Sequence, residues 1–84
     1  MNLRETLSQG QQADDLLRNP MLQQVFSELH SECVQDWLGA DPNDMETQHT
    51  AKMRANALYE VQRKLRIKLE NGKIAASVLE KQES

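Results

Sequence analysis

Two pairs in which asparagine or aspartate precedes proline divide the chain, Asn19-Pro20 and Asp41-Pro42. Proline disfavours helical backbone at the residue before it, yet it suits the first position of a helix, where its missing N–H is not needed. Asparagine and aspartate are preferred at the N-cap, the position before that. Each pair therefore predicts that one helix ends and another begins there.

The rest of the chain favours helix. Its β-branched residues are scattered singly and only three glycines occur, so strand signals are weak. We expect an all-α fold, a helical hairpin made of a helix at about 20–38 and a long helix at about 42–71. A short flanking helix at 11–18 precedes the hairpin, and a short C-terminal helical segment follows it.

Glycine marks the predicted ends of both hairpin helices. Gly39 follows the first of them, and Asn71-Gly72, a strong C-cap pair, follows the second. At 1.5 Å per residue the long helix spans about 43 Å and its partner about 28 Å, so the long helix must extend beyond its partner. The short N-terminal helix is then expected to cover Leu65 and Leu69.

A 3.6-residue period places apolar residues of both hairpin helices in stripes that we expect to form the core. The stripe of the first hairpin helix consists of Leu22, Val25, Phe26, Leu29, Cys33 and Trp37. The stripe of the long helix consists of Ala51, Ala55, Leu58, Val61, Leu65 and Leu69.

A second stripe lies on another face of the long helix. Its members are Met45, His49, Met53, Tyr59 and Ile67. We interpret it as a face for self-association or for a partner, and the alternative is scattered apolar exposure, which is normal for protein surfaces.

Opposite charges are divided along the chain. Residues 1–46 hold nine acidic and two basic residues, a net charge of −7, and the remaining residues hold eight basic and four acidic ones, a net charge of +4. We expect the two parts to attract each other within one small helical domain over residues 1–84, with frayed ends at 1–10 and 80–84.

Few residues point to chemistry. Cys33 is the single cysteine, so an internal disulfide is excluded. It shares a helix face with His30, but His49 points to the other side of its helix and no fourth ligand has suitable spacing, so we expect a buried thiol without metal. Paired carboxylates are interpreted as caps and solvated charges, because a thin hairpin has no cleft that would shift their pKa. Without a catalytic motif, we expect a non-enzyme that has no cofactor.

Basic residues gather near the end of the long helix. They are Arg63, Lys64, Arg66, Lys68 and Lys73. Phosphate contacts by this face are the basis of an alternative function, a nucleic-acid accessory protein. A sequence pI of about 5.3 and the lack of an aromatic platform for bases argue against it.

The string ADDLLRNPML is followed by Phe26, Leu29 and Trp37 and then by RANALYEVQRKLRIKLENGKIA. Over about residues 13–76 this pattern resembles a group of small bacteriophage proteins. In that group an A-x-x-LL-x-x-P element precedes an aromatic-bearing helix, and a charged helix with spaced leucines ends at a glycine. The genes of such proteins often lie among phage head and packaging genes. The resemblance therefore implies a phage or prophage origin and a role in virion assembly, and it supplies no catalytic residue.

These features together predict a phage-derived interaction protein that forms a homodimer or higher oligomer and binds a phage or host protein. A further alternative is an inhibitor of a host enzyme that uses the acidic residues within 28–46. We expect it in the cytoplasm of the bacterial host or with the virion. No apolar run approaches the ~18 residues of a membrane span, and the N-terminus lacks a secretory signal, so we expect no membrane contact.

Overall fold

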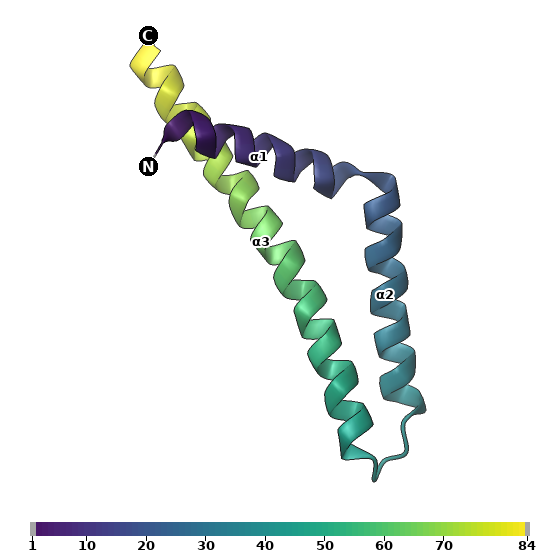
Figure 1. The fold of residues 1–84 in the computed structure, drawn as a ribbon. Coiled ribbons are helices and arrows are strands. Elements are labelled where there is room, and N and C mark those ends of the chain that lie inside the picture. Colours follow the sequence, from purple (N-terminus) through teal and green to yellow (C-terminus); the bar gives the residue numbers. More distant parts are fainter. Residues whose placement is uncertain (1, 84) are drawn as a thin grey trace. The chain divides into compact units, whose positions relative to one another are not determined.

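Three α-helices account for most of residues 2–83, the residues that the structure describes. In this computed structural model they are α1 (Leu3–Arg18), α2 (Pro20–Gly39) and α3 (Met45–Glu83) (Figure 1). No strand occurs within residues 2–83, so the all-α prediction is confirmed. The helices form two compact units. Unit 1 contains α1 and the part of α3 from Gln62 onward, and unit 2 contains α2 and α3 as far as Val61.

The first helix is longer than predicted. Residues 3–10 were expected to be frayed but are helical. Asn2 caps this helix, and the turns that extend it beyond the predicted start belong to unit 1. The Asn2 side-chain oxygen accepts the backbone N–H groups of Arg4 and Glu5 at 3.0 and 3.3 Å, as an N-cap residue does. The second helix agrees with the prediction to within one residue at its end.

The long helix begins three residues later than predicted. Asp41 and Asp44 bracket a turn, in which the Asp44 N–H donates to the Asp41 carbonyl oxygen at 2.8 Å. Pro42 occupies the second position of this turn, which its fixed φ also suits. Asp44 then caps α3, since one of its carboxylate oxygens accepts the Thr47 N–H at 3.0 Å and the other accepts the Thr47 hydroxyl at 2.6 Å. The prediction that Asp41 caps this helix was therefore wrong.

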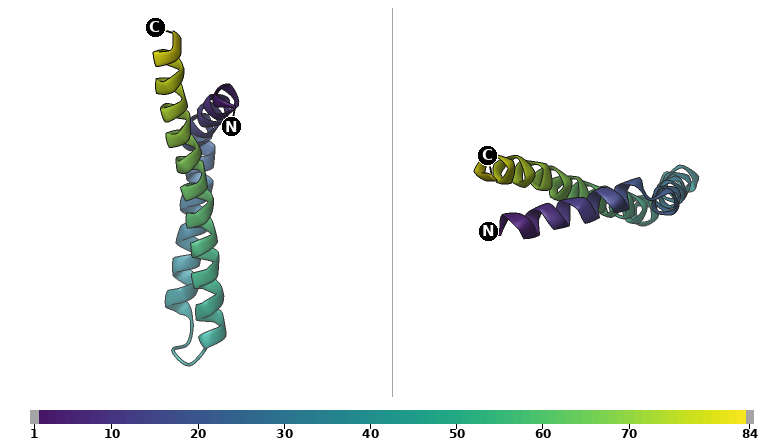
Figure 2. Two further views of the ribbon diagram at one scale, coloured as in Figure 1. Left: turned by 90° about the vertical axis from the view of Figure 1, so that its left-hand side faces the viewer. Right: turned by 90° about the horizontal axis from the view of Figure 1, so that it is seen from above.

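The predicted end of the long helix was also wrong. Figures 1 and 2 show α3 continuing without a break beyond Asn71-Gly72, and it reaches Glu83. Gly72 has no positive φ, so it does not act as a left-handed cap. It is instead a buried contact point for α1, because a Cβ built on Gly72 would lie 2.7 Å from the Gly10 Cα atom. A Cβ built on Gly10 would lie 2.6 Å from the Gly72 Cα atom, so neither position has room for a side chain.

Unit 1 is held together around this backbone contact. Ala13 and Ala75 are also buried. Leu69 and Leu7 lie beside the two glycines. Leu69 is thus packed beside the N-terminal helix as predicted, and the covering of Leu65 stays a prediction. At the edges, the Arg4 guanidinium lies 3.4 Å from a Glu83 carboxylate oxygen. Exposed pairs of this kind contribute little, roughly 0 to 1 kcal/mol, so the stability of unit 1 comes mainly from packing of its buried and half-buried apolar residues.

Unit 2 pairs α2 with the first part of α3 across a narrow contact. Cys33 and Ala51 are buried, and the half-buried positions include Leu22, Phe26, Leu29, Ala55 and Leu58. Along each helix these positions are alternately four and three residues apart. This spacing is typical of the narrow contact between two paired helices, which we call the seam. Three predicted core residues lie at or beyond its edge and are exposed, namely Val25, Trp37 and Val61. The predicted stripes were thus too broad, because each helix has only one neighbour in its unit.

The Gly72→Ala variant tests the close contact in unit 1. Alanine normally stabilises a helix interior by about 1 kcal/mol relative to glycine. Here its Cβ would clash with backbone, so we expect a net loss of roughly 1 to 3 kcal/mol. Urea and thermal unfolding followed by circular dichroism measure the change.

Gly39→Ala is the matched control, because a Cβ built on Gly39 meets no atom within 4 Å. We expect this variant to be as stable as the parent or slightly more stable. A Gly72→Ala protein that unfolds at or above the parent's temperature would contradict the tight crossing.

Candidate functional site

Large apolar side chains are exposed on all three helices. The only buried hydrophobic residues within residues 2–83 are Ala13, Cys33, Ala51 and Ala75. The exposed ones are Leu16, Met21, Val25, Val34, Trp37, Leu38, Met45, Met53, Tyr59, Val61, Ile67, Ile74 and Val78. Singly exposed apolar residues are normal, but a core without any fully buried large side chain is not. We therefore expect function at the surface of the helices.

The five residues of the predicted partner stripe are all exposed. Met45, His49, Met53 and Tyr59 belong to unit 2, whereas Ile67 belongs to unit 1. Their exposure is the property that an interaction face needs, and their role stays a prediction.

The predicted basic face lies entirely in unit 1, and parts of it are bonded there. The Lys68 ammonium donates to a Gln9 side-chain oxygen at 3.2 Å. The Lys73 ammonium lies 3.4 Å from a Glu70 carboxylate oxygen. Arg63, Lys64 and Arg66 are exposed. The five cations are thus spread over different surroundings.

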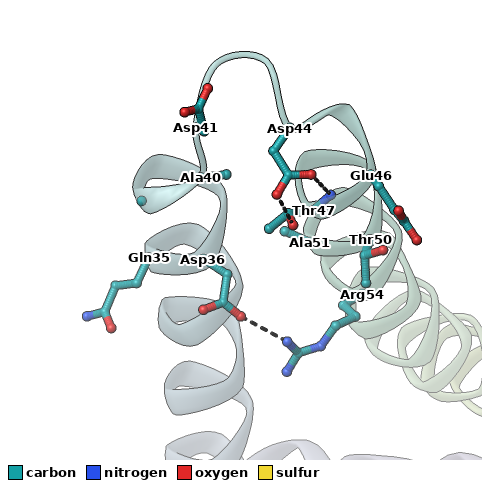
Figure 3. A pocket seen from close by; sticks show the side chains of 11 residues that line it. Gln35, Asp36, Ala40, Asp41, Asp44, Glu46, Thr47, Thr50, Ala51 and Arg54 are labelled. Carbon is teal, nitrogen blue, oxygen red and sulfur yellow. Dashed lines mark hydrogen bonds and ion pairs between the residues drawn. The ribbon is translucent and has the colours of Figure 1, made fainter.

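An acidic hollow of about 570 Å³ lies at the end of unit 2 where α2 and α3 are joined (Figure 3). Its carboxylates come from Asp36, Asp41, Asp44 and Glu46. Across the hollow the Arg54 guanidinium lies 3.1 Å from an Asp36 carboxylate oxygen, so one base already neutralises one acid. Within residues 2–83 no group of three or more His, Cys, Asp or Glu side chains is arranged to hold a metal ion.

Asp44 is a carboxylate of this hollow whose pKa is shifted by hydrogen bonds. The Thr47 hydroxyl and the Thr47 backbone N–H both donate to it, and these hydrogen bonds lower its pKa below the ordinary value. Both bonds favour the charged form. Asp44 therefore acts as a helix cap that is ionised at neutral pH.

A second hollow of unit 2, the Trp37 groove, is apolar. It has a volume of about 320 Å³ and is lined almost wholly by apolar atoms. Its lining residues are Cys33, Val34, Trp37, Ala51, Lys52 and Ala55. Cys33 and Ala51 are buried, whereas Trp37 is 54% exposed. A groove with so few polar groups cannot orient a polar ligand, but it can receive apolar side chains.

The sequence analysis missed this groove because Trp37 was assigned to the core. A signal was present, since the facing residues of α3 are the small Ala51 and Ala55. A large ring opposite two alanines leaves either the ring exposed or a hollow beside it.

No helix within residues 2–83 has the length and apolar content of a membrane span. No protein-family model matches the chain, and comparison with curated proteins and with solved structures found no match. The candidate site therefore depends on the geometry of this chain alone.

The Thr47→Val variant tests the Asp44 cap. It removes the hydroxyl donor, so the pKa of Asp44 should rise toward its ordinary value, which carboxyl-detected NMR titration measures. A folded-state pKa that is depressed adds stability above the unfolded pKa, and this stability is lost as the pH falls through the folded value. The parent should therefore exceed Thr47→Val in stability at neutral pH by a margin that shrinks on acidification below about pH 4. An unchanged Asp44 titration would contradict the assigned hydrogen bonds.

Cys33 is 2% exposed, which confirms the prediction that its thiol is buried. We expect native protein to react with a disulfide reagent at least tenfold more slowly than protein unfolded in urea, because the reagent must reach the sulfur. Absorbance of the released thiol measures both rates. Equal rates would mean that the seam of unit 2 opens freely.

Proposed function

We propose that this chain is a non-enzymatic protein–protein interaction protein that self-associates through exposed apolar helix faces. The observation that supports this most is the composition of its core. The side chains buried within residues 2–83 are small, and the large apolar ones remain partly in contact with water. A chain of this size has a thin core in any case, so covering apolar surface on association adds stability that the isolated fold lacks.

The gain in free energy comes mainly from apolar area. Removing apolar surface from water contributes roughly 25 cal/mol per Å² before the costs of association are subtracted. The ion pairs of the described residues lie at the surface, for example Arg18 with Asp14 at 2.9 Å. Such pairs add little to affinity, but opposite charges help to select the partner and the register.

Two members of the partner stripe are placed best for such a contact. Met45 and Tyr59 lie seven positions before and after Lys52, which lines the Trp37 groove, so helical periodicity sets them on the groove side of α3. Met53 follows Lys52 directly and is turned about 100° from it. We therefore assign the contact to the side of unit 2 that bears Met45 and Tyr59.

The biological setting of the proposal comes from the resemblance to small phage proteins. Under this proposal self-association serves virion assembly, and a phage or host protein is a further partner. Neighbouring head or packaging genes would support that setting, and neighbouring early genes would favour an inhibitor of a host enzyme.

Sedimentation equilibrium tests self-association directly. Between about 1 and 200 µM, a range typical of weak homotypic contacts, we expect the mean mass to rise from that of a 9.6 kDa chain toward at least twice that value. Tyr59→Glu should shift this rise to higher concentration, because an unpaired charge would be buried. Ala57→Glu, at an exposed position two residues away, is the control and should behave like the parent.

A parent that keeps the mass of one chain over the whole range would refute self-association. The exposed faces would then have to serve a foreign partner.

A further inference from the structure

The side of unit 2 that contains the Trp37 groove differs in charge from the rest of the unit. Residues 20–61 hold seven acidic and two basic residues, a net charge of −5. None of the seven acids lines the groove, and Lys52 is its one charged lining residue. Four of the acids, together with Arg54, line the other hollow.

Apolar and aromatic side chains are exposed on the side of unit 2 that contains the groove. Val34 and Trp37 line the groove and are exposed. Met45 and Tyr59, on the same side of α3 by helical periodicity, are 70% and 57% exposed. Trp, Tyr and Met are enriched at the centres of protein interfaces, where charged residues are depleted. This composition indicates a surface that binds protein.

The charge distribution indicates which protein would bind this surface. In a two-fold contact both copies use the same surface, so an acid in the contact needs a base of that same surface as its partner. Residues 20–61 hold seven acids but only two bases, and Arg54 is already paired with Asp36. Two units of charge −5 would repel each other across any face that carries those acids, and like charges in an interface are unfavourable. A foreign partner with basic groups would instead be attracted to the acidic hollow. A side without acids is therefore the one that a second copy can approach.

We infer that the Trp37 groove is the docking site for a second copy of this chain, with two copies of unit 2 packed about a two-fold axis so that Trp37 of each covers the groove of the other. This inference depends on the proposed self-association and assigns its surface. The contact involves few residues compared with the 20 to 30 per side of a standard complex, so it forms a concentration-dependent dimer of modest affinity.

The single tryptophan provides the test. Trp37 is the only one in the chain, so its emission reports on this site alone. As the concentration of full-length protein rises, we expect the emission maximum to shift to the blue and acrylamide quenching to fall. Both changes should follow the increase in mass measured by light scattering on the same samples.

A matched pair of variants locates the contact. Val34→Glu places a carboxylate in the groove and should raise the dissociation constant by more than about tenfold, since removing a charge from water is unfavourable even with Lys52 in the same groove. Met53→Glu places the same group on another side of α3, at a residue that is 57% exposed, and should leave both mass and emission changes intact. Circular dichroism establishes that each variant is folded, and if Val34→Glu is not, the emission of the parent protein decides.

The outcomes separate this inference from the proposed function. An increase in mass without a change in Trp37 emission would overturn the groove as the contact while leaving self-association in place. A dimer that survives Val34→Glu but not Met53→Glu would do the same. A constant mass at every concentration would refute both proposals.

Discussion

Small side chains at the helix contacts are the constraint on which both units depend. In unit 1 the backbones of Gly10 and Gly72 touch, since a Cβ on either would lie under 3 Å from the Cα atom of the other. In unit 2 the buried residues are the small Cys33 and Ala51. Close approach allows many weak dispersion contacts along the helix backbones. The larger apolar side chains at these contacts, such as Phe26 and Leu58, are only half-buried.

The exposed surface follows from these contacts. When a helix has one neighbour in its unit, only a narrow strip of it is covered, and side chains at the edge of that strip remain in water. Trp37 is such a residue, because it lies beside Ala51 and Ala55 and not between the helices. The features that hold each unit together thus create both the groove and the exposed ring beside it. Fold and candidate site have one physical origin in unit 2.

Periodicity predicted much of the fold. The helical class, the second helix, the burial of Cys33 and the covering of Leu69 all followed from a 3.6-residue pattern and from Asn19-Pro20. The errors occurred where one residue type serves two purposes. Pro42 suits a turn as well as a helix start, and the hydrogen bond from Asp44 to Asp41 shows that the turn prevails. Such a choice depends on neighbours that a local signal does not contain.

Glycine gave the same ambiguity at the other end of α3. Asn71-Gly72 has the pattern of a helix end, but a glycine inside a helix also permits close contact with another backbone. The partner of Gly72 is Gly10, 62 positions earlier, so sequence spacing alone could not identify it. The candidate site was predicted in part for a related reason. Exposure of Met45 and Tyr59 followed from their helix face, whereas the groove required knowing that α2 presents Trp37 to small residues of α3.

In the proposed dimer, charge acts mainly by keeping the acidic sides of unit 2 away from a second copy. The ion pair between Arg54 and Asp36 is about half exposed on both sides, and such pairs contribute little to stability or affinity. Repulsion between two copies of unit 2 is harder to offset, because its seven acids outnumber its two bases. In the dimer that we propose, the net charge of −5 restricts which side of unit 2 a second copy can approach, and the apolar side chains supply the attraction. At the Trp37 groove no acid is among the lining residues, and an exposed aromatic ring is present. The specificity of the proposed contact would come from both features.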